Sequence, residues 1–312
     1  MNARNVLRVL LLSLMSIHCS ALCQGQVDFR RADANGDEQI DISDAKCIHN
    51  YLFAGGPSPG SRDSADADDD GSITISDGDF ILQYLFVGGP QPPLPFPGVG
   101  PDLTADGLGS TTYPSNMVGQ GSSLGFNGPS QVVAPAGSGV QVPVSVVLTA
   151  QGHVQAWSVG VQAPGNGSLA DATTQGTVGA DVNDILPGLR NGGFEITQSA
   201  PGGVVSAVDL SSGWQQIVLP DGTSNTVLNL VLEGTAPSAG SSEIWGLQFS
   251  DGIRGSGQPV QNIVSVGGRS FVPAIESYHV EVIGIPEPST LVLGAIGLLL
   301  LGTVGWRRRI RA

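Results

Sequence analysis

The sequence is poor in cysteine, lysine and aromatic residues. Three of its 312 residues are cysteines, and only Cys47 lies beyond residue 25. A single thiol cannot form an internal disulfide, so other interactions must stabilise the fold. Lys46 is the only lysine, and charged residues make up 13% of the chain. Because long helices favour Ala, Leu, Glu and Lys, this scarcity, with 45 glycines and 21 prolines, predicts strands joined by turns.

Positive charge is also scarce outside the two ends of the chain. The formal net charge is −14, with 27 acidic and 13 basic residues. Several of the basic residues lie at the extreme ends, namely Arg4, Arg8, Arg307, Arg308, Arg309 and Arg311. The central part is therefore strongly acidic, which excludes nucleic acid as a natural partner and favours cations.

Residues 1–25 have the pattern of a secretory signal peptide. Arg4 and Arg8 precede an apolar run at residues 9–15, and Ser20 and Ala21 offer a cleavage point. The run is shorter than the roughly 20 apolar residues that a membrane span requires. The sequence therefore predicts export, after which Cys47 is the only cysteine left.

Residues 286–312 have the pattern of a membrane-anchoring and sorting segment. Pro286-Glu287-Pro288 is followed by an apolar run at 290–306 and by three arginines at 307–309. At ~1.5 Å per residue this run reaches roughly 25 Å, which suits a single C-terminal transmembrane helix in a thin bilayer. The arginines favour the cytoplasmic side, leaving the preceding chain outside.

This arrangement resembles the PEP-CTERM sorting signal of bacterial surface and matrix proteins. The resemblance implies recognition by an exosortase, cleavage near the tripeptide at 286–288, and delivery to the cell envelope, surface or extracellular matrix. An ordinary tail anchor is the alternative, although such an anchor does not require that tripeptide.

Residues 33–44 recur at 66–77 without a gap, and the match continues to the Gly-Gly-Pro sequences at 55–57 and 88–90. Calcium prefers 6–8 oxygen ligands, and each 12-residue loop offers oxygens at positions one, three, five, seven, nine and twelve. We therefore predict about two Ca²⁺ ions. The predicted ligands are Asp33, Asn35, Asp37, the Gln39 carbonyl, Asp41 through water and Asp44 in the first loop, and Asp66, Asp68, Asp70, the Ser72 carbonyl, Thr74 through water and Asp77 in the second loop.

The sixth loop position differs between the two copies. Gly71 permits a sharp turn in the second loop, whereas Glu38 replaces it in the first loop. This difference predicts backbone strain and weaker calcium binding in the first loop.

Each loop is followed by apolar residues at helical spacing, which predicts one short helix after each loop and none before either. Two such loop–helix units resemble the dockerin type I module over residues 27–90. The resemblance implies calcium-dependent folding and binding of a cohesin domain in polysaccharide-degrading assemblies. Ile42-Ser43 and Ile75-Ser76 stand where well-studied dockerins carry Ser-Thr-type partner contacts, so the identity of the partner does not carry over.

Residues 91–121 form a linker, and prolines between 90 and 101 predict that it begins as a stiff extended spacer. Residues 122–285 follow with apolar residues alternating in several segments, which predicts an antiparallel β-sandwich of eight or nine strands. The strand segments at 140–144, 155–161 and 245–250 resemble those of cohesin-like and carbohydrate-binding sandwiches. The expected fold class is therefore mainly β, with a small helical module before the sandwich.

No catalytic constellation emerges from the sequence. The Gly-x-Ser-x-Gly strings at 56–60 and 121–125 lack the strand and helix that a nucleophile elbow requires. Five carboxylates considered as a glycosidase pair are interpreted as scattered surface acids: Glu195, Asp209, Glu233, Glu243 and Asp251. Trp157 and Trp245 alternate with the core pattern, which leaves Trp214 as the exposed aromatic residue that could stack on a sugar.

The sequence thus predicts a non-catalytic, exported surface or matrix protein. A calcium-dependent, dockerin-like module would associate with a cohesin-like domain or with a second copy of the chain. The alternative is a carbohydrate-binding surface protein of a polysaccharide-degrading system, with a glycan as the partner.

Overall fold

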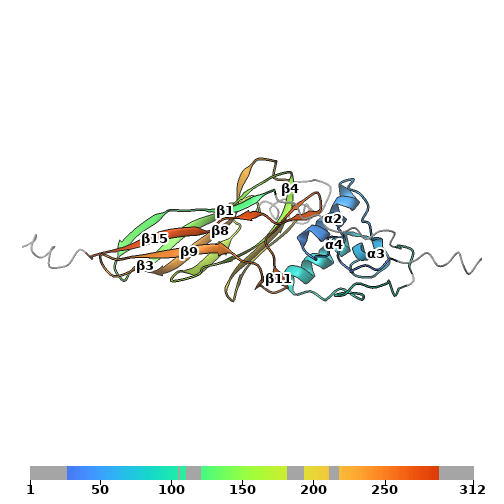
Figure 1. Ribbon diagram of the computed structural model, residues 1–312, viewed down its shortest axis with the longest axis horizontal. Helices are drawn as coiled ribbons and strands as arrows, with labels where there is room; N and C mark the ends of the chain where they lie inside the picture. Colours follow the sequence, from blue (N-terminus) through green and yellow to red (C-terminus); the bar gives the residue numbers. More distant parts are fainter. Residues whose placement is uncertain (1–26, 105, 110–120, 181–192, 211–217, 288–312) are drawn as a thin grey trace, which may run out of the picture.

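The computed structural model describes residues 27–104, 106–109, 121–180, 193–210 and 218–287. A helical region lies at one end of an elongated β-sandwich (Figure 1). The predicted signal peptide at 1–25 and the predicted membrane span at 290–306 lie outside the described residues. Within those residues, no helix combines the length and apolar character needed to cross a membrane.

Both helices predicted after the loops are present. These are α2 (Ile42–Phe53) and α4 (Ile75–Leu82), and α4 continues directly into a π-helical turn, η1 (Gln83–Val87). A third helix, α3 (Arg62–Ala65), precedes the second loop, where the sequence predicted none. It is one short turn, which begins because the Ser61 side chain accepts a hydrogen bond from the backbone N–H of Ser64 at 3.0 Å.

The strands form two main sheets, in the orders β14-β1-β3-β8-β5 and β13-β12-β4-β9-β15-β2, with β7 and then β6 joined to β4. The short β10 and β11 pair separately. The bounds are β1 (Ser123–Asn127), β2 (Gln131–Pro135), β3 (Gly139–Thr149), β4 (Val154–Gln162), β5 (Ser168–Thr173), β6 (Phe194–Ala200), β7 (Gly203–Asp209), β8 (Ser224–Thr235), β9 (Ser242–Phe249), β10 (Ile253–Arg254), β11 (Pro259–Val260), β12 (Ile263–Val266), β13 (Arg269–Phe271), β14 (Ala274–Ile275) and β15 (Tyr278–Ile285).

The sequence predicted an antiparallel sandwich, but two of the strand pairs are parallel. β1 pairs with β14 in parallel, and β2 pairs with β15 in parallel. After β1 the chain passes from the first sheet to the second, where β2 lies beside the last strand and runs in the same direction. The remaining strand pairs are antiparallel, among them the long pair of β3 and β8.

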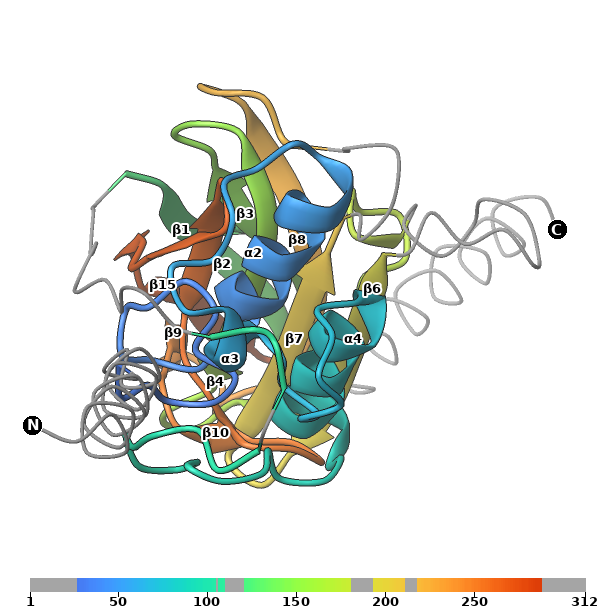
Figure 2. The ribbon, with the colours of Figure 1, turned by 90° about the vertical axis from the view of Figure 1, so that its right-hand side faces the viewer.

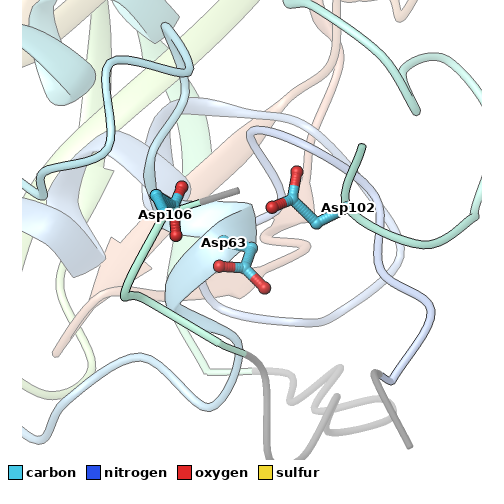
Figure 3. A group of neighbouring side chains, drawn as sticks. All are labelled: Asp63, Asp102 and Asp106. Carbon is cyan, nitrogen blue, oxygen red and sulfur yellow. The ribbon is translucent and has the colours of Figure 1, made fainter. Parts of the chain in front are cut away.

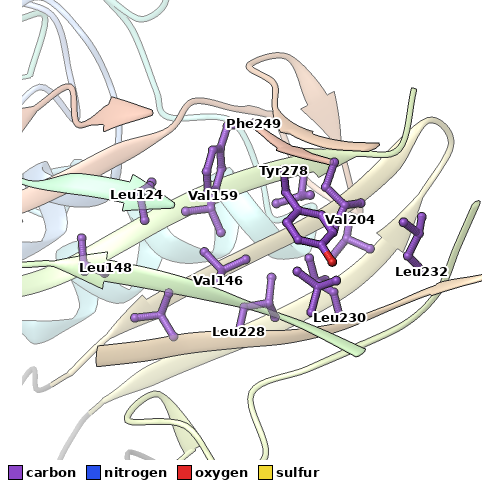
Figure 4. Close-up of a cluster of buried hydrophobic side chains, with 14 of the residues drawn as sticks. Leu124, Val146, Leu148, Val159, Val204, Leu228, Leu230, Leu232, Phe249 and Tyr278 are labelled. Atoms are coloured by element: carbon purple, nitrogen blue, oxygen red, sulfur yellow. The ribbon is translucent and has the colours of Figure 1, made fainter. Parts of the chain in front are cut away.

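Alternating residues of the strands fill the space between the two sheets. β3 alternates buried and more exposed residues along its length, as its sequence predicts. Figure 4 shows Val146, Leu148 and Leu228 among the side chains that form this core. Trp157 and Trp245 are fully buried, which confirms their predicted place in the core.

β4 is buried on both faces. Every residue from Val154 to Val161 is buried, although only alternate residues can point into the sandwich. Trp157 and Val159 belong to the sandwich core, whereas Ala156 belongs to a second apolar cluster that includes α2 and α4. The helical region covers this outer face of the sheet (Figure 2).

The proline-rich segment after η1 turns back over the helical region and is not the extended spacer predicted from its sequence. Arg31 donates a hydrogen bond from Nε to the Leu94 carbonyl at 2.9 Å, and Phe96 packs edge-on against Tyr84 at 5.4 Å. These contacts hold the segment because a buried guanidinium requires several carbonyl or carboxylate acceptors. The residues that follow, 110–120, lie outside the described parts of the chain.

Candidate functional site

The first carboxylate of each loop holds the backbone of that loop in a tight curl. Asp33 accepts hydrogen bonds from the backbone N–H groups of Gly36 and Asp37 at 2.9 and 3.1 Å, and from Glu38 at 2.9 Å. Asp66 accepts equivalent bonds from Asp70 and Gly71 at 3.1 and 2.9 Å. The two copies therefore share backbone geometry as well as sequence.

Both loops require a left-handed backbone conformation at their fourth and sixth positions. The φ angles are +75° at Gly36 and +70° at Glu38 in the first loop, and +63° at Asp69 and +87° at Gly71 in the second. Each loop thus has one glycine and one residue with a Cβ in this region, which costs an L-residue about 1–2 kcal/mol. The turn predicted to be strained at Glu38 is present, and its effect on calcium affinity stays a prediction.

The last loop residues also start the helices. Asp41 and Thr74 are the N-caps of α2 and α4, where each accepts a hydrogen bond from the N–H two residues later. Asp44 completes a capping box by accepting from the Asp41 N–H at 2.9 Å, and Asp77 does the same for Thr74 at 2.8 Å. Because Asp44 also accepts from the N–H of Asn35 at 3.1 Å, it joins the beginning of the loop to the helix.

The second loop brings three acidic side chains together. Carboxylate oxygens of Asp66, Asp68 and Asp70 all lie within 4.8 Å of one another. Two oxygens on one calcium ion, each ~2.3–2.6 Å from it, are separated by no more than about 5 Å, so this group fits one ion. In the first loop, among the described residues, no three acids meet the same limit. There the third position is Asn35, whose amide Nδ2 donates to Asp37 at 3.1 Å.

The two residues predicted to supply carbonyl ligands form matching backbone hydrogen bonds in the two loops. The backbone N–H of Gln39 donates to Asp37 Oδ1 at 3.0 Å, and that of Ser72 donates to Asp70 Oδ1 at 2.9 Å. In each loop, the backbone N–H of the seventh residue is therefore paired with the carboxylate of the fifth.

The loop carboxylates are crowded and poorly solvated. Burial raises the pKa of Asp41 and of Asp66 to about 6 and that of Asp77 to about 7. Burial, together with the charges of Asp33, Asp41 and Asp37, raises the pKa of Asp44 well above its ordinary value. A cation relieves such an accumulation of negative charge, which agrees with the fit of oxygen ligands around calcium.

A further acidic group, Asp63, Asp102 and Asp106, lies beside the second loop (Figure 3). Arg31 already supplies a buried positive charge there, with Nη2 at 3.0 Å from Asp102 and 2.8 Å from Asp69. Its Nη1 donates to the backbone carbonyls of Asp63 and Asp66 at 3.1 and 2.8 Å. This guanidinium ties the start of the helical region to the second loop and to the segment after η1.

A buried group of charged side chains lies where α2 meets the sandwich. Lys46 Nζ lies 2.9 Å from one carboxylate oxygen of Asp209 at the end of β7, and His49 Nδ1 lies 3.2 Å from the other. The Lys46 side chain is 2% exposed and that of Asp209 is fully buried. Burial alone would raise the pKa of Asp209, but the charges and hydrogen bonds of Lys46 and His49 outweigh it and hold the pKa below its ordinary value.

A second polar pair lies beside this ion pair. Asn50 in α2 and Gln155 in β4 exchange two side-chain hydrogen bonds, at 3.0 and 3.1 Å. Gln155 also accepts from the backbone N–H of Gly268 at 3.2 Å. The buried side-chain amides of Asn50 and Gln155 are therefore hydrogen-bonded to each other, although α2 and β4 lie far apart in sequence.

The rest of this contact is apolar and close. Phe86 in η1 packs against Phe194 in β6, with ring centroids 5.7 Å apart. The backbone N–H of Gln258 donates to the Leu85 carbonyl at 2.7 Å. A Cβ atom on Gly268 would lie 2.8 Å from Cys47 Cα, so the backbones approach too closely for any other residue there.

Sequence reasoning missed this contact and interpreted Asp209 wrongly as a scattered surface acid. Asp209 is a buried partner of the only lysine in the chain. A lone lysine on the same helix as Ile48 was the one available signal, because a buried ammonium needs an acidic partner. Trp214, the predicted sugar-stacking residue, lies outside the described residues, so glycan binding stays a prediction.

Sequence comparisons find two known segments in the chain. Residues 31–86 match the family model of the dockerin type I domain, and residues 284–309 match that of the PEP-CTERM protein-sorting motif. No curated protein matches the chain in sequence.

Solved structures similar to this chain include cohesins and cohesin–dockerin complexes. A non-cellulosomal cohesin from Archaeoglobus fulgidus is 13% identical, with a TM-score of 0.32, over 53% of this chain and 92% of that one. A type I cohesin–dockerin complex from Clostridium thermocellum is 11% identical, with a TM-score of 0.35, over 52% and 95%. The sixth cohesin of scaffoldin B from Acetivibrio cellulolyticus is 16% identical, with a TM-score of 0.33, over 53% and 99%.

Both matched segments contain the sequence patterns described above. The repeated loop–helix units lie within the segment matched at residues 31–86, and the Pro-Glu-Pro tripeptide lies within the segment matched at 284–309. The chain therefore carries a dockerin type I domain followed, at its C-terminal end, by a PEP-CTERM protein-sorting motif.

Proposed function

We propose that this protein is a non-catalytic, exported surface or matrix protein whose dockerin domain mediates calcium-dependent association with other proteins. The convergence of Asp66, Asp68 and Asp70 within a segment that matches the dockerin model is the observation that carries this proposal. Dockerin domains are interaction modules, and the PEP-CTERM motif is a sorting motif for export. Together they describe a protein that is delivered to the surface and associates there.

The proposed calcium ligands are those of the two loops, with about one ion in each. When bound, calcium supplies the positive charge that balances the crowded carboxylates. Asp44 and Asp77 then serve two purposes, because each is a proposed ligand and the residue that completes the cap of its helix. Ordering of α2 and α4 is therefore coupled to calcium through these two carboxylates.

The proposed partner is a cohesin-like domain of another protein or of a second copy of the chain. The proposed attachment is at least transient, through the apolar run at 290–306, with removal at the Pro-Glu-Pro tripeptide as the sorting step. The proposed domain boundaries remain residues 27–90 for the dockerin module, 91–121 for the linker and 122–285 for the sandwich.

Calorimetric titration of the full chain in detergent with calcium tests this proposal. We expect about two sites in the natural chain and the loss of one site in each of the variants Asp33→Ala and Asp66→Ala. The exposed strand residue Asp171 provides a matched control, since Asp171→Ala removes the same charge outside the loops. Absence of calcium binding in the natural chain would refute the proposed function.

A further inference from the structure

The dockerin domain in this structure lies against the sandwich of its own chain. Helix α2 packs on β4, β7, β12 and β13, and η1 packs on β11. The covered sheet face belongs to an apolar cluster shared by both parts, separate from the cluster between the two sheets. Figure 2 shows α2 and α4 side by side in front of β7.

The sandwich side of this contact is shaped to receive helices. Ala156 and Ala207 face the helical region with small side chains, and Val205 and Ile263 add apolar surface. Gly268 lies so near α2 that a Cβ atom on it would be 2.8 Å from Cys47 Cα. Small residues on a sheet face permit the close approach that a helix pair needs for dense packing.

The centre of the contact is polar and specific. The Lys46–Asp209–His49 group and the Asn50–Gln155 pair are buried between the two parts, and each joins a helix residue to a strand residue. Buried paired charges are uncommon in the core of a single domain, whereas desolvated charge pairs fix orientation in interfaces between proteins. This face thus has the composition of a recognition surface.

The first calcium loop meets the same side of the sandwich. Asn35 Nδ2 in the first loop donates to Ser270 Oγ in β13 at 3.3 Å. The element that calcium is proposed to order is therefore the element that contacts the sandwich.

We propose that the sheet face formed by β4, β7 and β12 is a receptor for the dockerin helix pair, and that the chain's own dockerin occupies it. The inference rests on the proposed function, since it concerns the availability of the dockerin domain to partners. A tethered module is present at high effective concentration beside its receptor. A partner that needs the same helix face binds only the undocked fraction, so its apparent affinity falls by that fraction.

The proposal predicts that docking does not depend on the covalent connection between the two parts. A site for a sequence-specific protease, inserted in the full chain between residues 109 and 121, allows the connection to be cut after folding. We expect the two fragments to stay together during size-exclusion chromatography in calcium at micromolar concentration, with the mass of one uncut chain. Separation of natural fragments that both keep their secondary structure would overturn the proposal.

Two sandwich variants test the named contacts without altering the calcium loops. Asp209→Asn removes the charge opposite Lys46 and should weaken fragment association about 30-fold or more. Ala207→Arg places a large cation where α2 packs and should separate the fragments. Val133→Arg, on the exposed part of β2, is the matched control and should leave association unchanged. Association equal to that of the natural fragments in both interface variants would also overturn the proposal.

Calcium titration of the same cut samples separates this inference from the proposed function. If calcium still binds while the natural fragments fall apart, the docking proposal fails and the proposed function stands. If no calcium binds, the proposed function fails. Calcium binding together with association that depends on Asp209 supports both.

Discussion

Removal of the Asp209 carboxylate is the sharpest test of how the two parts of the chain are held together. The variant Asp209→Ala leaves the Lys46 ammonium buried, 2% exposed, without the oxygen that now lies 2.9 Å away. Removing one partner of a buried ion pair costs about 3–5 kcal/mol, because the remaining charge stays out of water and loses the opposite charge beside it. A typical domain is stable by only about 5–15 kcal/mol, so this change removes a large part of the total.

Urea denaturation measures this loss, with the helix signal at 222 nm and the fluorescence of the buried Trp157 and Trp245 as separate probes. We expect the helix signal to change at lower urea than tryptophan fluorescence in the variant, because undocking precedes unfolding of the sandwich. The exposed acid Asp171 again provides the control, and Asp171→Ala should change the free energy of unfolding by less than about 0.5 kcal/mol.

A paired variant checks the cause of the loss. Lys46→Met combined with Asp209→Leu leaves neither charge in the interface and should recover most of the stability, since apolar replacement of a buried pair is often neutral. A loss below about 1 kcal/mol in Asp209→Ala would refute the reasoning, as would a paired variant that is as unstable as the sum of its two single changes.

Four further predictions concern helix packing, loop strain, the response to pH and the response to calcium. Gly78→Ala should destabilise the chain by about 1–3 kcal/mol in denaturation, because its Cβ would lie 2.1 Å from His49 Nε2, whereas helix propensity alone predicts a gain of about 1 kcal/mol. Glu38→Gly should raise the thermal stability of the calcium-loaded chain by about 1 kcal/mol, by removing a side chain from a φ of +70°; a lower melting temperature would contradict this. Lys46, His49 and the nearby Asp79 face Asp209, and the folded pKa of Asp209 lies below the ordinary 3.8. The stabilisation by this carboxylate is therefore full above about pH 4 and is lost as the pH falls through the lowered folded pKa. In denaturation measured across pH, the natural chain should lose its advantage in stability over Asp209→Asn only in that acid range. Chelation of calcium should reduce the helix signal while the strand signal of the sandwich persists, and equal loss of both would show that the two parts unfold together.

The pattern of short-range features in the sequence was sufficient to predict the local structure of the helical region. The loop ligands, the cap residues and the apolar residues of each helix all lie within one short stretch of chain, as in the 20-residue segment from Asp33 to Leu52. The same holds for the alternation in β3, where buried residues recur at every second position. Local spacing is retained in the fold because hydrogen bonding along helices and strands fixes which side chains share a face.

The sequence could not predict which surfaces the helical region would meet. Asp209 resembled other acids of the sandwich, and its partner Lys46 lies 163 positions away. A small residue such as Ala156, on the outer face of β4, does not reveal whether that face is exposed to water or covered by a helix. The proline-rich segment likewise had the composition of a spacer, yet its Leu94 carbonyl accepts a hydrogen bond from Arg31, and the segment packs on the helical region.

The sequence by itself determined the loop repeat, the helices that follow the loops, the alternating strands and the C-terminal sorting motif. Only the tertiary structure decided that the dockerin domain lies on its own sandwich, with Lys46 and Asp209 paired out of water. The reason is that repeats, caps and alternation depend on neighbours along the chain. Docking depends instead on the complementarity of two surfaces, to which distant residues contribute without any shared spacing.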